Sequence, residues 1–143
     1  MTAGYPDIWC SDVWAAWSLV ATQAAVDAAS RADPAQIRSL RVLFAELAGQ
    51  EDARDWESLL AAIYVGIAEA SGNRAYEALV YELWQVLIAA GPSWDVAARL
   101  WPVRGWAEVS LGEVIAGLVD ADPGPVRRAM ERHLGGAVDA LDR

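Results

Sequence analysis

His133 and Cys10 are the two residues of this chain best suited to chemistry, and each is the only one of its type. An imidazole can bind a metal, act as a general base, or hold buried hydrogen bonds in its neutral form. Catalysis by histidine also needs a nucleophile and an orienting group within reach. Cys10 lies in a poorly specified stretch near the N-terminus, and the sequence has no G-x-S-x-G elbow. We therefore predict that the chain is not an enzyme. His133 keeps three possible roles: a buried neutral imidazole bonded to Tyr64 or a carbonyl, a ligand contact, or a metal ligand or base.

The elements that must position these side chains are helices, because apolar residues recur every three or four positions along almost the whole chain. His133 continues the last of these stripes after Val126 and Met130. Gly72 is expected to end one helix in the left-handed conformation, and Pro102 to interrupt another. The expected helices span residues 7 or 11–31, 34–49, 52–70, 73–91, 92–101, 106–119 and 123–141. Since the connections are short, we predict one all-α domain over residues 1–143, an antiparallel bundle of six or seven helices.

Composition excludes several classes of protein. The net charge is −9 and every basic residue is arginine. The densest basic cluster, Arg127, Arg128 and Arg132, is interrupted by Glu131, so this chain alone is not expected to bind nucleic acid. No apolar run approaches the roughly 18 residues of a membrane span, and no signal peptide precedes the first helix. A single cysteine cannot form an internal disulfide, so we predict a soluble cytoplasmic protein.

Three stretches carry a resemblance to a known family. They are IAEASGN within LAAIYVGIAEASGN, the ending LGEVIAGLVDADPGPVRRAMERHL, and the first helix WSLVATQAAVDAASRAD. Together they resemble the effector-binding (FCD) domain of GntR-type transcription regulators of the FadR subfamily. The resemblance implies a homodimer that binds a small metabolite and acts on DNA through an N-terminal winged helix-turn-helix. No winged-helix sequence occurs in this chain, so we expect a fragment of a longer regulator or a free-standing relative.

The resemblance also implies positions for a metal site, which many members of the family build from one aspartate and three histidines. Those positions here are Leu60, Tyr64, Leu111 and His133, so only the last keeps a ligand. One imidazole cannot supply the coordination shell of a divalent ion. We therefore predict that the chain binds no metal and needs no cofactor.

The replaced residues make the expected site apolar. Trp17 and Ala21 stand where the resemblance implies an arginine and a glutamate, and Leu60 and Leu111 replace two of the metal ligands. We predict a pocket for an apolar or acyl-type metabolite between the helices. A polar head of that metabolite would be received by three side chains, those of Tyr64, Arg104 and His133.

Two other functions stay open. The chain could be a pure dimerisation module whose core is filled by its own side chains. It could also be a metal-dependent sensor of organic acids that uses His133 with Asp55 or Glu57. Tryptophans exceed what one small core needs, and some are expected at a subunit interface. The candidates for that interface are Trp9, Trp14, Trp84, Trp94, Trp101 and Trp106.

Overall fold

Helices make up nearly all of the computed structural model, which describes residues 7–90 and 95–141, with side chains described for 10–90 and 95–137. The elements are α1 (Asp7–Arg31), α2 (Pro34–Ala48), α3 (Ala53–Ala70), α4 (Arg74–Ile88), α5 (Val96–Leu100), the 3-10 turn η2 (Trp101–Val103), α6 (Arg104–Val119) and α7 (Pro123–Leu141). The predicted all-α architecture is confirmed. The sixth predicted helix began two residues late, because the chain is helical again directly after the turn that holds Pro102.

Short polar side chains define where the helices begin. Asp33 accepts a hydrogen bond from the backbone N–H of Gln36, whose side chain bonds back to the backbone of Asp33, and this capping box starts α2. Asn73 accepts from two backbone N–H groups at the start of α4. Gly72 has a φ of +71°, so the expected left-handed end of α3 is confirmed.

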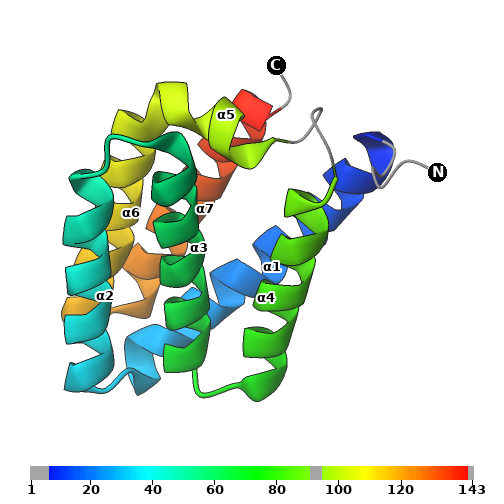
Figure 1. The fold of residues 1–143 in the computed structure, drawn as a ribbon. Helices are drawn as coiled ribbons and strands as arrows, with labels where there is room; N and C mark the ends of the chain where they lie inside the picture. The colour runs from blue at the N-terminus through cyan, green and yellow to red at the C-terminus, as the bar shows by residue number, and fades with distance from the viewer. Residues whose placement is uncertain (1–6, 91–94, 142–143) are drawn as a thin grey trace.

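The long helix α1 organises the bundle. It packs against α3, α4, α6 and α7, and in Figure 1 it runs obliquely behind α3 and α4. The helix α2 lies beside α3 and also contacts α6, while α6 and α7 form the most extensive helix pair. Because every long helix touches at least two others, side chains from α1, α3, α6 and α7 can meet at one point in the interior.

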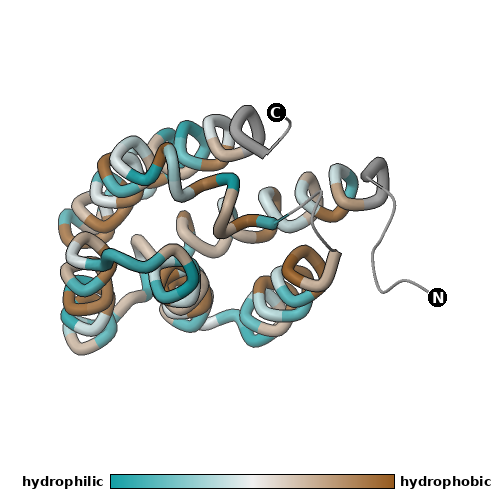
Figure 2. Tube along the Cα trace, turned by 45° about the horizontal axis from the view of Figure 1, so that its top comes forward, coloured by the Kyte–Doolittle hydropathy of each residue, from teal (hydrophilic) through white to brown (hydrophobic). Residues whose placement is uncertain are grey.

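The interior is apolar and rich in tryptophan. Hydrophobic and hydrophilic residues alternate along each helix tube in Figure 2, as expected of helices that are buried on one face only. Trp17 and Trp56 are fully buried and are the largest side chains of the core. No helix among the described residues is both long and apolar enough to cross a bilayer.

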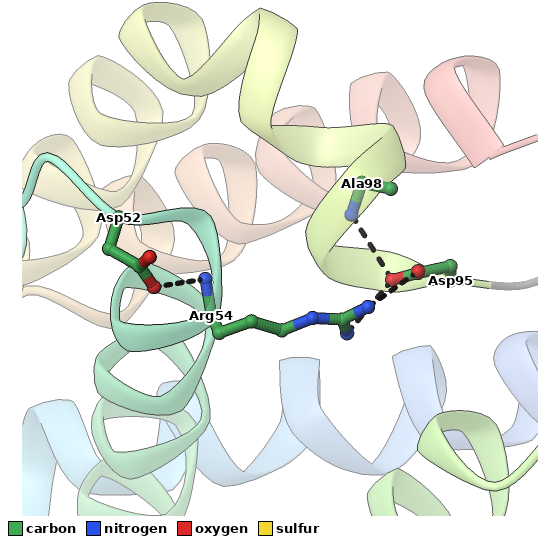
Figure 3. Close-up of polar contacts among 4 residues, drawn as sticks. All are labelled: Asp52, Arg54, Asp95 and Ala98. Carbon is green, nitrogen blue, oxygen red and sulfur yellow. Dashed lines mark hydrogen bonds and ion pairs between the residues drawn. The ribbon is translucent and has the colours of Figure 1, made fainter.

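At the surface, an ion pair connects the beginnings of α3 and α5. The two terminal guanidinium nitrogens of Arg54, Nη1 and Nη2, donate to the carboxylate of Asp95 at 3.1 and 2.8 Å (Figure 3). The same carboxylate caps α5 by accepting from the backbone N–H of Ala98. Arg54 in turn donates its backbone N–H to the cap residue Asp52. These contacts fix α5 and the turn that follows it against the first turn of α3.

Candidate functional site

Three helices each place one polar side chain at the same buried point. The Nε2 of His133 on α7 lies 2.6 Å from the Oη of Tyr64 on α3. The Nδ1 of the same ring lies 2.7 Å from the Oγ of Ser110 on α6. All three side chains are buried, and His133 is 1% exposed. We call these three residues the polar cluster.

Helical periodicity explains why these residues point inward. Tyr64 follows Leu60 by one turn on the buried stripe of α3, and both side chains are in the core. His133 follows Met130 by three residues on the buried stripe of α7. Ser110 lies next to Leu111 on α6, and both are buried. Each polar side chain is therefore carried into the interior by the apolar residues of its own helix.

The hydrogen bonds of the polar cluster determine where its protons lie. The Oγ of Ser110 is 3.1 Å from the backbone carbonyls of both Trp106 and Ala107. A carbonyl only accepts, so the single hydroxyl proton of Ser110 is donated there and its oxygen accepts from Nδ1–H of His133. The Nε2 of His133 then carries a lone pair and accepts the hydroxyl proton of Tyr64. This tautomer, assigned from the network, gives every donor in the cluster an acceptor.

Burial keeps the polar cluster uncharged. Loss of solvation lowers the pKa of His133 to about 4, although a hydrogen bond with the backbone of Ala107 opposes that change. Burial also raises the pKa of Tyr64, and the negative charge of Glu57 adds to the effect. At neutral pH the cluster therefore consists of a neutral imidazole, a phenol and an alcohol.

Aromatic rings surround the polar cluster. The ring of Trp17 meets the ring of Tyr64 edge-on, with centroids 4.8 Å apart, and Trp84 lies 5.3 Å from Tyr64. The ring of Trp106 stacks on His133 with centroids 5.7 Å apart and an interplanar angle of 12°. We call the set of rings around Tyr64 and His133 the aromatic cluster: Trp14, Trp17, Trp84 and Trp106. These spacings are those of rings in direct contact.

A buried carboxylate lies at the edge of the aromatic cluster. The Oε1 of Glu57 accepts a hydrogen bond of 3.1 Å from the indole N–H of Trp84. Burial raises the pKa of Glu57, while this hydrogen bond and the charge of Arg54 act in the opposite direction. From the sequence, Glu57 was considered only as a possible metal ligand. In the structure it orients a tryptophan of the cluster.

The residues at the implied metal positions offer little to a metal. Leu60 and Leu111 are buried hydrocarbon, and the hydroxyl of Tyr64 occupies the lone pair of His133 Nε2. Asp55 is exposed at the first turn of α3. Within the described part of the chain, no three His, Cys, Asp or Glu side chains gather closely enough to hold a metal ion. The expectation of a metal-free site stays a prediction, and it now has a chemical reason.

The structure distributes the predicted site residues unevenly. Trp17, Tyr64 and His133 lie in contact, and Ala21, Leu60 and Leu111 belong to the same buried core. Arg104 is exposed at the first residue of α6. Its guanidinium lies 3.9 Å over the ring of Trp101 and donates to the Trp101 carbonyl. These contacts give no support to the expected role of Arg104 beside Tyr64 and His133.

Two of the six tryptophans named as candidates for a subunit interface are core residues. Trp14 and Trp84 are buried within this chain, so the interface explanation is wrong for them. Trp101 and Trp106 keep partial exposure, whereas the side chains of Trp9 and Trp94 lie outside the described residues. The excess of tryptophan therefore has an internal cause, the aromatic cluster.

Sequence reasoning missed Ser110. It is a lone hydroxyl among the inward residues Ala107, Leu111 and Val114 of α6. The signal that could have found it is the need of a buried imidazole for two partners, since a neutral ring has one donor and one acceptor nitrogen.

A surface groove of about 630 Å³ lies between α2, α3 and α4, next to the aromatic cluster. Its lining includes Leu40, Tyr81 and Trp84, together with the carboxylates of Asp33 and Glu69. Its volume lies in the range of small-molecule sites, roughly 300–1,000 Å³. Trp84 faces this groove and also packs on Tyr64, so a molecule in the groove would touch the cluster from outside.

Comparison with known proteins places the site within a family. The FCD domain family matches residues 12–136, a range that contains the whole of the polar and aromatic clusters. A search among curated proteins finds no match.

Proposed function

Because the chain belongs to the FCD domain family, the C-terminal effector-binding domain of GntR-family regulators, we propose that it is a metal-free sensor of an apolar or acyl-type metabolite. FCD domains belong to regulatory proteins rather than to enzymes.

One observation supports the metal-free part of this proposal. The Tyr64 hydroxyl lies 2.6 Å from Nε2 of His133, the lone pair that a metal would need. The other nitrogen carries the proton that Ser110 accepts, so neither nitrogen is left for coordination. A metal at His133 would have to displace Tyr64 and would find leucine at two of its other ligand positions, 60 and 111.

The aromatic cluster supports the apolar character of the effector. The residues around Tyr64 and His133 are rings and aliphatic side chains, and both polar residues are uncharged at neutral pH. The rings are in contact, so an effector enters only if side chains move aside. An acyl chain or another elongated apolar molecule gains most from replacing these contacts, because its burial removes apolar surface from water.

The response we propose is a shift between two arrangements of the helices. The polar cluster joins α3, α6 and α7, so a molecule that separates Tyr64 from His133 changes how these helices pack. In a homodimer in the cytoplasm, this change would alter the spacing of two DNA-binding domains that lie outside residues 1–143. Binding and rearrangement are then two sides of one equilibrium.

The test has two measurements on the purified chain. Elemental analysis after addition and removal of excess Zn²⁺ is expected to find no stoichiometric metal. Native mass spectrometry after gentle purification is expected to show a retained lipid, or a complex after addition of 1-decanol. A metal bound in a one-to-one ratio and lost in His133→Ala would refute the proposal.

A second function, a dimerisation module with a filled core, is favoured by the close contacts among the rings of Trp17, Tyr64 and Trp84. It predicts a dimer that binds neither lipid nor 1-decanol. The same mass spectra therefore separate the two functions, since they report both the number of chains and the mass of any bound molecule.

A further inference from the structure

Trp106 separates the polar cluster from solvent. Its ring lies nearly parallel to the imidazole of His133, and it is 37% exposed while His133 is 1% exposed. Trp106 is therefore partly in contact with solvent, and one face of its indole covers the only imidazole of the chain. Two other rings of the aromatic cluster, those of Trp17 and Trp84, are only 0% and 2% exposed.

The closed position of Trp106 depends on a glycine of α7. A Cβ at Gly136 would lie 2.1 Å from Cζ2 of Trp106 and 2.6 Å from Cη2, far inside van der Waals contact. A Cβ at the neighbouring Gly135 would meet nothing within 4 Å. The ring can thus lie across α7 only because residue 136 has no side chain.

The attachment of Trp106 to the fold is weak. It lies in the first turn of α6, where the cap residue Val103 makes no side-chain hydrogen bond and Gly105 has open space around its Cα. The indole N–H groups of Trp17 and Trp84 each donate to a protein acceptor, Val80 and Glu57. Among the described residues, Trp106 is held by the contact of its ring with His133 and not by a hydrogen bond of its indole N–H, so the ring can turn outward without breaking one.

The charges around the polar cluster restrict what could bind there. The nearby basic side chains are engaged elsewhere: Arg104 lies on Trp101, and Arg132 pairs with Glu113. The carboxylate of Glu57 accepts a hydrogen bond from Trp84, whose ring packs against Tyr64, and its negative charge acts on the Tyr64 hydroxyl. An anion brought to His133 would meet a neutral ring and a carboxylate, while Arg104 and Arg132, in the part of the chain that the structure describes, are already paired and would not compensate its loss of water.

From these contacts we propose that Trp106 is a movable cover, and that the group which enters beneath it is an uncharged hydrogen-bonding group such as an alcohol, ester or amide. The proposal rests on the proposed function, since it specifies the route and the head group of the apolar effector. A hydroxyl of the effector can donate a hydrogen bond to the free lone pair of the Tyr64 oxygen. A carbonyl can accept the hydrogen bond that the Tyr64 hydroxyl now donates to His133.

The cover is tested without any effector. Diethylpyrocarbonate modifies exposed imidazoles, and one histidine per chain makes its absorbance change specific to His133. In Gly136→Ala the added methyl displaces Trp106, and His133 should react at least about tenfold faster than in the unsubstituted chain. Gly135→Ala, the matched control, should react at the original rate. Trp106→Ala should reproduce the effect of Gly136→Ala, and equal rates in all four proteins would overturn the cover.

The head group is tested with two probes that share one chain length, 1-decanol and decanoate, at neutral pH. The readout is the NMR signals of the ring nitrogens of His133, which report hydrogen bonding at Nδ1 and Nε2 separately. We expect 1-decanol to shift the Nε2 signal and decanoate to bind at least about tenfold more weakly. Equal or tighter binding of decanoate would overturn the proposal.

The outcomes also separate this inference from the proposed function. If 1-decanol binds but leaves the His133 signals unchanged, and Ala62→Trp in the groove between α2, α3 and α4 abolishes binding, the effector occupies that groove and the inference falls alone. If neither probe binds even in Trp106→Ala, the apolar effector itself is refuted, and with it the head group proposed here.

Discussion

The polar cluster and the Arg54–Asp95 pair both connect helices through hydrogen bonds, but in opposite surroundings. The cluster is buried and uncharged, whereas the side chains of Arg54 and Asp95 are 70% and 26% exposed and carry full charges (Figure 3). The chain thus keeps charge where water still solvates it and keeps neutral hydrogen bonds where water is excluded. The exposed Arg54–Asp95 pair adds little to the free energy of unfolding, because exposed charges gain little by pairing. The buried polar cluster is costly to disturb, because its groups would lose hydrogen bonds that water cannot replace.

The two regions also show that one direction of pKa shift can have two causes. Partial burial pushes the pKa of Asp95 upward, but hydrogen bonds from Ala98 and Arg54 outweigh it and hold the pKa below its usual value. The pKa of His133 is lowered because burial disfavours the charged form. Asp95 is therefore kept charged by the hydrogen bonds that it accepts, whereas His133 is kept neutral because water is excluded from its ring.

Trp17→Ala is expected to have the largest effect on stability, and it tests how tightly the buried region is packed. The side chain is fully buried, touches Trp14, Tyr64 and Trp84, and donates its N–H to the carbonyl of Val80. Its removal should lower the free energy of unfolding by about 3–5 kcal/mol, measured by urea denaturation.

Trp106→Ala is the control for this measurement, because its ring is partly exposed and should cost clearly less. If Trp17→Ala changed the free energy of unfolding by less than about 1 kcal/mol, the rings would not be packed as described. An open pocket would then exist before any effector binds.

Acid pH should come next in size, and between pH 6.5 and about 4 it acts on the buried region through His133. The pKa of His133 is about 4 in the folded chain and 6.5 without the fold, so between these values only the unfolded chain takes up the proton. The contribution of the neutral His133 to the free energy of unfolding is therefore complete above pH 6.5, and it is lost as the pH decreases toward about 4. The loss reaches about 3 kcal/mol, at about 1.4 kcal/mol per pH unit.

Two measurements check this dependence. The imidazole signal of the folded chain should not titrate near pH 6.5, where an exposed histidine would. His133→Gln should lack this part of the pH dependence. Glu57 has a raised pKa and therefore contributes with the opposite sign, but its contribution is the same in both proteins and cancels when their stabilities are subtracted. A histidine titration with a midpoint near 6.5 in the folded protein would contradict the burial of the cluster.

Tyr64→Phe tests the assigned proton positions at a smaller cost. It keeps the ring contacts with Trp17 and Trp84 but leaves the Nε2 lone pair of His133 buried without a donor, so it should cost about 1–3 kcal/mol. Ser110→Ala should cost less, because the carbonyl of Ala107 can still accept from Nδ1–H. The reverse order in urea denaturation would mean that the imidazole proton is on Nε2.

The same cluster shows how far the sequence could predict the site. The pair of Tyr64 and His133 followed from two helical stripes in register with a family pattern, and the contact at 2.6 Å is the one expected for a buried neutral imidazole. The only residue of α6 that the sequence assigned to the site was the apolar Leu111, whereas the hydrogen bond to Nδ1 of His133 is made by its neighbour Ser110. Neighbouring residues on a helix differ by about 100° in direction and 1.5 Å in height. Only the rotation of α6 against α7 decides between them, and periodicity does not contain that rotation.

The surface residues were harder to predict for a different reason. The break at Pro102 predicted that the helix before it would end, but not where the side chains after it would point. Arg104 lies on Trp101, and Trp106, two residues later, covers His133. Both positions depend on the neighbouring helix, and Gly136 in particular carries no sign in the sequence that a ring lies across it. The fold was therefore predictable from local patterns, and the position of the ring that covers His133 was not.

The smallest effect is expected at the exposed pair, where Arg54→Ala should cost less than about 1 kcal/mol and lose even that in high salt. Asp95→Ala should cost more than Arg54→Ala, because it also removes the cap that accepts from the N–H of Ala98. Asp95→Asn is the matched control, since it keeps a capping oxygen and removes the charge, and it should resemble Arg54→Ala. All three are measured by urea denaturation at two salt concentrations. A salt-independent cost for Arg54→Ala as large as that of Tyr64→Phe would show that surface charge holds the bundle as firmly as the buried cluster does, and the contrast between the two regions would fail.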